Sequence, residues 1–332
     1  MTNPKVVCIG EALIDRIIRK SDNKYKNYLG GAPANVACAL SKLKISTAFI
    51  GCIGDDNYGH NFVNLFQNLN ININFLDINK KYSTRVVKVV SDQYGDRSFS
   101  GFDNSSNNAF ADEMLDIGFL KKNLLDLNKV FLSAKFLITG TILLASPESY
   151  ESLLFLIKSA TKYKVKIVID LNWREIFWQN INNSKMIPSL EQKEKIKEFL
   201  CFADIIKLAK EEALLFLNSS DPVKISQSLP KLPDVIITDG AKPIFWFING
   251  KSGSMEVNNS IKIVDTTGAG DAFLAGLISQ LSECSSNLDS LQIKKMVKFA
   301  SCCGLLACSG EGAIENQPDI ESVNQLLGSL GS

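Results

Sequence analysis

The sequence predicts an α/β fold with a mostly parallel central sheet and a small antiparallel sheet that projects from it. Two observations lead to this prediction. Short apolar runs alternate with segments of helix length along most of the 332 residues. One stretch in the first third of the chain breaks this alternation and has the pattern of a hairpin.

The strands expected in the central sheet are rich in β-branched residues and are bounded by Gly, Asp or Asn, as is typical of strands buried on both faces. They are Val6–Gly10, Thr47–Gly51, Lys135–Gly140, Lys166–Asn172, Asp204–Leu208 and Val235–Gly240. Segments of helix length lie between them, such as Pro33–Leu43, Pro147–Tyr163 and Ser189–Phe202. Strand and helix in alternation favour parallel pairing.

The projecting sheet is predicted from two segments. Thr84–Phe102 reads as two strands around a polar turn that contains glycine, and Ala12–Lys20 has a similar character. No linker rich in Pro, Gly or Ser divides the chain. We therefore expect a single domain over residues 1–332, in which about residues 12–30 and 83–108 form a mobile lid.

Composition argues against several classes of function. The chain has 36 Lys and Arg against 35 Asp and Glu, so its net charge of +1 does not indicate a nucleic-acid surface. No apolar run is long enough to span a membrane, and the N-terminus lacks the profile of a signal peptide. The eight cysteines form no CxxC pair, and His60 is the only histidine. We expect a cytoplasmic protein with free thiols and neither a histidine metal site nor a catalytic triad.

The stretch DTTGAGDAF, Asp265–Phe273, joins a glycine turn to an apolar helix. Backbone N–H groups at the start of a helix lack partners and carry partial positive charge, and glycines allow phosphate oxygens to approach them. Gly268, Ala269 and Gly270 therefore predict an anion hole, with the helix beginning near Asp271. We expect Asp271 to play two parts, as the N-cap, worth about 1 kcal/mol, and as a general base beside the anion.

A second glycine turn precedes a helix in GGAPANVACALSKL, Gly30–Leu43. The paired glycines and Asn35 suit a polyhydroxylated ligand that approaches closely and needs both donors and acceptors. The alternative is an ordinary helix start with Pro33 in the first turn.

Together, the segments GGAPANVA and DTTGAGDAF resemble the two signatures of the ribokinase-like (PfkB) sugar kinases, and the chain as a whole is most similar to fructokinases. The resemblance implies a ribokinase-like three-layer fold with an antiparallel β lid. Other segments align in the same order over essentially the whole chain: GEALIDRI (Gly10–Ile17), GCIGDDNYG (Gly51–Gly59), DLNWREIFW (Asp170–Trp178), ADIIKLAKEEALLFL (Ala203–Leu217) and FASCCGLLACSGEGAI (Phe299–Ile314).

The resemblance implies a catalytic base at Asp271, with the anion hole at Gly268, Ala269 and Gly270. It implies substrate contacts, mostly with sugar hydroxyl groups, from Asp15, Gly31, Asn35, Arg174 and Asp103. On the nucleotide side it implies Lys207, Glu212, Thr238, Gly240 and Ser301, of which Glu212 organises Mg²⁺ and water. Asp265 and Thr267 match positions that often hold a monovalent cation such as K⁺.

Three positions depart from the family pattern. Ala209 stands where the family has the asparagine of NxxE, and Pro243 replaces the second glycine of a nucleotide loop. Asp103 stands where fructokinases and 2-keto-3-deoxygluconate kinases usually have an arginine. If Asp103 faces the substrate, it disfavours a sugar acid, because an unpaired charge in a closed site is costly.

The resemblance implies phosphoryl transfer from ATP, with Mg²⁺, to a sugar hydroxyl. We also expect a homodimer formed through the lid, because the lid strands need a partner at their edge. Fructose is the first choice of substrate; ribose, 2-keto-3-deoxygluconate and fructose 6-phosphate are alternatives, and so is a PfkB-fold protein without catalysis. A dinucleotide-dependent oxidoreductase is disfavoured because GAGDAF lies late in the chain and ends in Phe273 rather than glycine. A P-loop kinase is disfavoured because NGKSG, Asn249–Gly253, lacks the upstream glycine and suits a hairpin turn.

Overall fold

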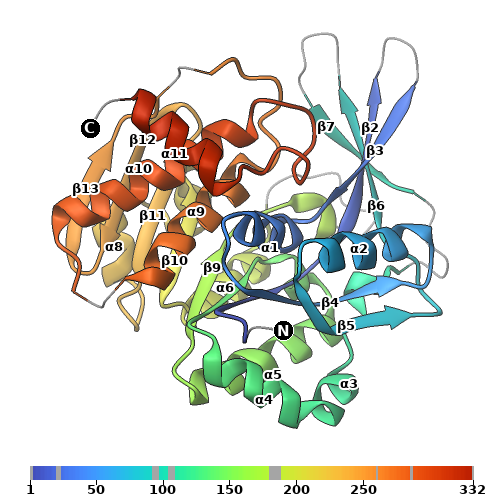
Figure 1. Cartoon of the computed structure of the whole chain (residues 1–332). Helices are drawn as coiled ribbons and strands as arrows, with labels where there is room; N and C mark the ends of the chain where they lie inside the picture. Colours follow the sequence, from blue (N-terminus) through green and yellow to red (C-terminus); the bar gives the residue numbers. More distant parts are fainter. Residues whose placement is uncertain are drawn as a thin grey trace.

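The computed structural model describes residues 3–19, 24–91, 97–103, 109–178, 188–258, 261–284 and 287–330. A central nine-stranded sheet runs through the molecule in the order β13-β12-β11-β10-β9-β8-β1-β4-β5 (Figure 1). Its strands are β1 (Val6–Ile9), β4 (Thr47–Gly54), β5 (Asn72–Asn79), β8 (Phe136–Thr139), β9 (Lys166–Asp170), β10 (Ile205–Ala209), β11 (Asp234–Asp239), β12 (Lys242–Ile248) and β13 (Lys251–Met255).

Every pairing from β5 to β11 is parallel, and β12 and β13 continue the sheet antiparallel. The six strands expected from the sequence all belong to the parallel part, which confirms the predicted mostly parallel sheet. NGKSG contributes the turn between β12 and β13, where Asn249 and Gly250 adopt positive φ angles. Pro243 lies at the register shift between β11 and β12, where a strand tolerates a residue without an N–H.

Helices cover both faces of the sheet, because side chains along each strand alternate between two cores. Val6 and Cys8 pack into one core, while Val7 and Ile9 pack into the other. The first core is covered by α1 (Ala32–Lys42), α2 (Asn57–Asn68), α9 (Ala269–Glu283), α10 (Ser290–Ala307) and α11 (Ile320–Ser329). The second is covered by α3 (Ile117–Lys122), α4 (Leu124–Ser133), α5 (Pro147–Lys162), α6 (Leu190–Leu200), α7 (Lys210–Leu217) and α8 (Pro222–Gln227).

A separate four-stranded sheet projects beside α1 and α2, at the upper right of Figure 1. It consists of β3 (Tyr25–Gly30), β2 (Leu13–Arg19), β6 (Val86–Ser91) and β7 (Arg97–Phe102), in that order. Its two outer pairings are antiparallel, as predicted, and β2 pairs with β6 in parallel. The polar turn expected inside Thr84–Phe102 and residues 104–108 lie outside the described residues.

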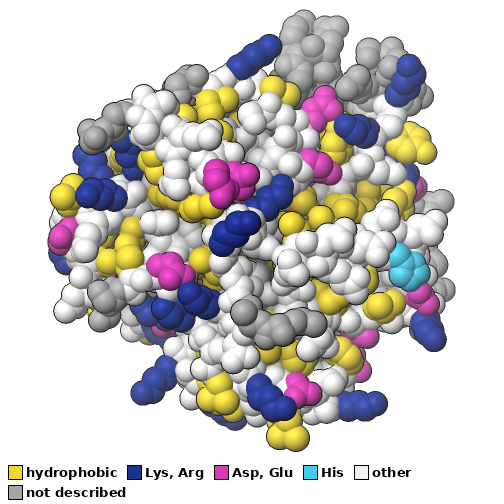
Figure 2. Space-filling model, in the orientation of Figure 1, with side chains coloured by type: hydrophobic (Ala, Val, Ile, Leu, Met, Phe, Trp, Pro, Cys, Tyr) yellow, Lys and Arg dark blue, Asp and Glu magenta, His cyan; other side chains and the backbone are white. Residues whose placement is uncertain are grey.

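On the face shown in Figure 2, basic and acidic side chains are interspersed rather than gathered by sign. Within the part of the chain that the structure describes, no helix combines the length and the apolar composition needed to cross a membrane.

Candidate active site

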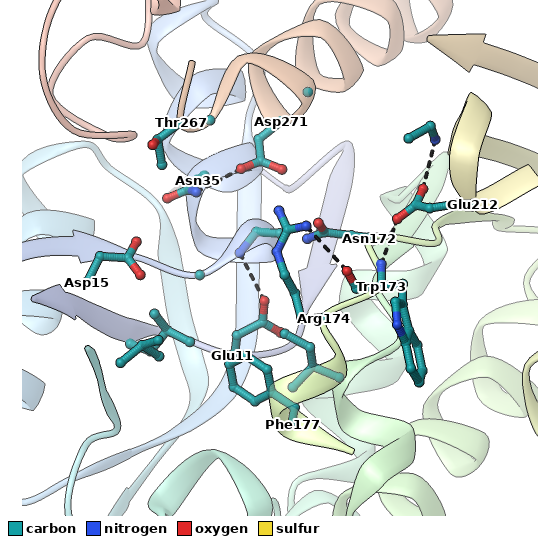
Figure 3. Close-up of a pocket in the computed structure, with 18 of the residues that line it drawn as sticks. Glu11, Asp15, Asn35, Asn172, Trp173, Arg174, Phe177, Glu212, Thr267 and Asp271 are labelled. Atoms are coloured by element: carbon teal, nitrogen blue, oxygen red, sulfur yellow. Dashed lines mark hydrogen bonds between the residues drawn. The ribbon is translucent and has the colours of Figure 1, made fainter. Parts of the chain in front are cut away.

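A cavity of about 690 Å³ lies between the four-stranded sheet and the carboxyl ends of the central strands. Leu13, Asp15, Val87 and Val89 line it from the small sheet. From the large sheet and its following loops, the cavity is lined by Glu11, Ile142, Asn172, Trp173, Arg174, Glu175, Phe177, Lys207, Ala209 and Thr238. The starts of α1, α7 and α9 complete the wall. Figure 3 shows how the labelled side chains converge on this space.

The glycine turn before α9 has the backbone that its sequence predicts. Gly268 is the N-cap with φ of 78°, a left-handed conformation, and a Cβ atom there would lie 2.8 Å from Cβ of Ala313. Helix α9 begins at Ala269, so the expected start near Asp271 is wrong by two residues, and Asp271 is not the N-cap. The backbone N–H groups of Gly270 and Asp271 meet no acceptor among the described residues, as an anion hole requires.

Asp271 and Asn35 bring the two glycine motifs together. Nδ2 of Asn35, in the first turn of α1, donates a hydrogen bond of 2.7 Å to Oδ2 of Asp271 (Figure 3). Burial and, to a lesser degree, the nearby Asp170 raise the pKa of Asp271 to about 6, against the opposing influence of Asn35, Lys207 and Arg174. Asp271 is therefore a buried carboxylate with a pKa close to neutrality, which suits a general base.

The two glycines of the GGAPAN turn are required because neighbouring atoms lie too close for a Cβ atom. A Cβ atom at Gly30 would lie 2.4 Å from Oδ2 of Asp15, and one at Gly31, where φ is 101°, would lie 2.5 Å from the carbonyl oxygen of Glu11. Oδ1 of Asn35 is buried and has no hydrogen-bond partner in the described structure. Since a buried acceptor without a partner is costly, this amide is suited to a hydroxyl group of a ligand.

Lys207 lies at the centre of a group of carboxylates. Its Nζ forms a buried ion pair of 2.9 Å with Asp170, and a Cβ atom at Gly270 would lie 2.8 Å from it. Burial alone lowers the pKa of Lys207, but the surrounding carboxylates, of which Asp170 acts most strongly, outweigh it and raise the pKa. A charged ammonium group is thus held against the first turn of α9.

Glu212 fixes the backbone at the end of two strands. Its Oε1 accepts the N–H of Trp173 and its Oε2 accepts the N–H of Ala209, each at 2.7 Å (Figure 3). Burial followed by Asp170 raises the pKa of Glu212, which these two amides and Lys207 oppose. The contact with Ala209 uses the backbone, so the missing asparagine side chain at this position does not disturb it.

Arg174 follows β9 and lines the cavity opposite α1. Nη1 of Arg174 contacts the carbonyl oxygen of Trp173 at 3.3 Å, and no salt bridge to Arg174 occurs among the described residues. Its positive charge lowers the pKa of Asp271, which places the guanidinium group within electrostatic reach of that carboxylate. This cation can receive an anionic or hydroxylated ligand group.

Most of the site residues expected from the sequence line this one cavity. They are Asp15, Gly31, Asn35, Arg174, Lys207, Glu212, Thr238, Thr267, Gly268, Gly270 and Asp271. Five expected residues do not line it: Asp103, Gly240, Asp265, Ala269 and Ser301. Ala269 and Asp265 flank the turn, Gly240 occupies the turn between β11 and β12, and Ser301 lies within α10.

Asp103 pairs away from the cavity. Its carboxylate contacts Arg16 of β2 and, at 3.5 Å, Lys88 of β6. Arg16 also donates to Asn27 and Tyr58, so it belongs to a polar group around β2 and β3. In the described structure Asp103 does not line the cavity, and its expected effect on a sugar acid stays a prediction.

Asp265 holds the turn before α9 in shape. Its Oδ1 accepts the N–H and the hydroxyl group of Thr267, at 2.9 and 2.7 Å, and its Oδ2 accepts the N–H of Gly312 at 3.1 Å. Among the described residues, no cluster of three or more His, Cys, Asp or Glu side chains is arranged for a metal ion. A cation at this turn would therefore be held mainly by backbone and hydroxyl oxygens.

Glu11 and Asn172, which line the cavity, and Asp170, which pairs with the cavity residue Lys207, were not among the predicted functional residues. All lie inside segments that align with the family, GEALIDRI and DLNWREIFW, and each follows or ends a central strand. Their position at the carboxyl end of a parallel strand was the available signal.

Comparisons with known proteins agree with this geometry. The family model of the pfkB family carbohydrate kinases matches residues 3–320. A probable fructokinase-5 of Arabidopsis thaliana is 32% identical over 335 residues, which cover 98% of this chain and 97% of that protein. The structure of a Xylella fastidiosa fructokinase with bound ATP superposes with a TM-score of 0.83 at 23% identity and covers 99% of both chains. The structure of a double mutant of Vibrio cholerae O395 fructokinase with fructose, ADP and potassium bound superposes with a TM-score of 0.78 at 25% identity and covers 98% and 99%. The chain belongs to the PfkB family of carbohydrate kinases.

Proposed function

We propose that this carbohydrate kinase transfers the γ-phosphoryl group of ATP to a hydroxyl group of fructose. The observation that carries the proposal is the contact between Asp271 and Asn35. It brings a carboxylate with a pKa of about 6 to the point where the start of α1, suited to a polyol, meets the unpartnered N–H groups of α9, suited to phosphate.

In this mechanism Asp271 removes the proton of the attacking hydroxyl group, since a sugar hydroxyl is a weak nucleophile at neutral pH. Asn35 orients the Asp271 carboxylate through its N–H, and its buried Oδ1 accepts a second hydroxyl group of the sugar. Asp15 and the backbone at Gly31 contact further hydroxyl groups from the lid side.

The N–H groups of Gly270 and Asp271 stabilise the negative charge that develops on the transferring phosphoryl group. Lys207 adds a positive charge at the same place, because its Nζ lies against Gly270. Asp170 and Glu212 would hold Mg²⁺ directly or through water, as is usual for one or two carboxylates, and the ion would supply further charge neutralisation when it is bound with ATP. Thr238 of β11, with Gly240 and Ser301 farther from the centre, lies on the nucleotide side.

Fructose is proposed because relatives that resemble this chain over almost its whole length are named fructokinases. Ribose, 2-keto-3-deoxygluconate and fructose 6-phosphate remain as candidates, and Arg174 is available to pair with an acidic or phosphorylated sugar. We propose a K⁺ ion at the Asp265–Thr267 turn by analogy with the potassium-bound relative. We further propose a cytoplasmic homodimer formed through the lid, because its outer strands β3 and β7 each pair with one strand among the described residues.

The experiment is ADP release measured with ATP and Mg²⁺ against fructose, ribose, 2-keto-3-deoxygluconate and fructose 6-phosphate. We expect the highest kcat/KM with fructose. A preference for ribose would contradict fructose as the substrate but would still mean that the substrate is a neutral sugar. A preference for 2-keto-3-deoxygluconate or fructose 6-phosphate would indicate that Arg174 binds the anionic group of the sugar. No turnover of any sugar would favour the non-catalytic alternative. Light scattering of the full chain tests the dimer.

A further inference from the structure

Glu11 is a buried carboxylic acid in the sugar side of the cavity. It directly precedes the lid segment, between β1 and β2, and only 2% of its surface is exposed. Its carboxyl group lines the cavity, and Oε1 accepts the N–H of Ala32, the first residue of α1, at 2.9 Å (Figure 3). Glu11 thus supplies the capping bond that Gly31, the N-cap residue of α1, cannot make with a side chain.

The hydrogen-bonding capacity of the Glu11 carboxyl group is only partly used, by the N–H of Ala32 and by the backbone N–H of Glu11 itself. Among the described residues, Oε2 accepts no hydrogen bond from another residue, and no lysine or arginine forms an ion pair with Glu11. A buried carboxylate in that situation is costly, and protonation removes the cost. Burial, together with the lesser influence of Asp112 and Asp271, raises the pKa of Glu11 to about 8, although its own N–H and that of Ala32 oppose this.

We infer that Glu11 is a substrate-binding residue: one carboxyl oxygen is fixed by the first N–H of α1, and the other hydrogen-bonds an oxygen atom of the sugar. The protonated group donates that hydrogen bond at neutral pH. This inference rests on the proposed function, because it assigns the residue to the polyol side of the same site. It also links the sugar to α1, which carries Asn35, the partner of Asp271.

The charged groups around Glu11 determine how its role depends on pH. Asp112, which precedes α3, is bound to Arg85 at the base of the lid, and Asp271 faces Glu11 from α9. Both carboxylates disfavour ionisation of Glu11. Above about pH 8 Glu11 loses its proton, the donor disappears and a negative charge enters the sugar site. Sugar binding is therefore expected to weaken as the pH rises through this value.

The test compares Glu11→Gln, Glu11→Ala and a matched control, Glu283→Gln. Glutamine keeps both an acceptor for Ala32 and a donor for the sugar but cannot ionise. Glu283 is an exposed glutamate at the end of α9, paired with Lys5 and remote from the cavity, so the same chemical change there reports non-specific effects. The measured quantities are kcat and KM for fructose between pH 6 and about 9.5, or for the best sugar of the panel, and the thermal unfolding midpoint of each variant.

We expect Glu11→Ala to raise KM about 10- to 100-fold with a smaller change in kcat, because a buried partner of the sugar is lost. Glu11→Gln should stay within about threefold of the wild type at pH 7. Above about pH 8, KM should rise for the wild type and the control and stay constant for Glu11→Gln. If Glu11→Ala unfolds, the Glu11→Gln comparison decides alone.

Two results would overturn the inference and are distinguishable. A wild type that phosphorylates a sugar, with the same alkaline rise of KM in Glu11→Gln as in the wild type, excludes Glu11 while leaving the proposed function intact. A wild type that turns over none of the sugars overturns the proposed function, and the role of Glu11 with it.

Discussion

Glu11 and Glu212 occupy opposite sides of one cavity and share burial, a raised pKa and a bond to a backbone N–H. They differ in the partners of their carboxyl oxygens. Both oxygens of Glu212 accept backbone N–H groups, and Lys207 lies close enough to lower its pKa. Among the described residues, Glu11 accepts one hydrogen bond from another residue, the N–H of Ala32, and forms no ion pair. A buried acid whose two oxygens both accept backbone N–H groups stabilises that backbone and has little capacity left, so we expect Glu212 to meet Mg²⁺ mainly through water. An acid with an oxygen that no other residue binds has more capacity left for a direct contact with a ligand.

The same contrast separates the two sides of the site. On the proposed nucleotide side, Lys207 pairs with Asp170 and also lies close enough to Glu212 to oppose the rise in its pKa. On the sugar side, Glu11 and Asp271 depend on neutral partners, Ala32 and Asn35. In the proposed mechanism, the negatively charged phosphates of ATP bind on the side that holds the cation Lys207, and proton transfer takes place on the side where the acids form no ion pair among the described residues.

The largest effect is expected from Asp271→Asn. It preserves the shape of the side chain and its contact with Asn35 but removes the base, so kcat should fall on the order of 10²–10⁴-fold. The thermal unfolding midpoint should change little, since a buried carboxylate without an ion pair is replaced by an amide. A variant with near-normal turnover would remove Asp271 from the catalytic role.

The next effect is on stability. Lys207→Met leaves the buried Asp170 without its ion-pair partner, and breaking a buried pair in this way costs about 3–5 kcal/mol. Lys207→Met with Asp170→Asn removes both charges and should recover part of this loss. Chemical unfolding of the two variants measures the difference. If the single and double variants are equally stable, the ion pair between Lys207 and Asp170 does not contribute to stability as the structure indicates.

The smallest effect is expected from Asp103→Asn. Asp103 is partly exposed, bound to Arg16 and Lys88, and does not line the cavity, so kcat/KM should change by less than about threefold for any sugar. A larger and sugar-dependent change would return Asp103 to the substrate site. Arg174→Gln is the informative companion, because Arg174 does line the cavity.

Most of the fold could be predicted from the sequence, because the strands have recognisable patterns of apolar residues. Examples are the β-branched run Lys166–Asn172 and the hairpin pattern in Thr84–Phe102. The parallel pairing of β2 with β6 was not, since pairing partners depend on long-range packing. Within the site, the two glycine motifs could be predicted from the sequence. Gly268 and Gly31 have positive φ angles and close neighbours, and both conditions require glycine.

The other features of the site could not be predicted from local sequence patterns. Asp103 was placed by alignment, and only the coordinates show that Arg16 and Lys88 hold it outside the cavity. The start of α9 was misplaced because an aspartate at the third helical position looks like an N-cap in sequence. Glu11 was overlooked because its burial and its bond to Ala32 arise from the packing of α1 against the end of β1.

The central claim is that Asp271 acts as the base of a sugar kinase, and the pH dependence of kcat/KM tests it most directly. A base must be deprotonated to work, so activity is retained above the pKa of Asp271, about 6, and lost as the pH falls through it. With fructose, ATP and Mg²⁺, we predict that kcat/KM of the wild type falls about tenfold per pH unit below about pH 6, and that the residual activity of Asp271→Asn lacks this acid limb. An acid limb of the same position and slope in Asp271→Asn, or a wild-type kcat/KM that stays constant down to about pH 5, would contradict the account.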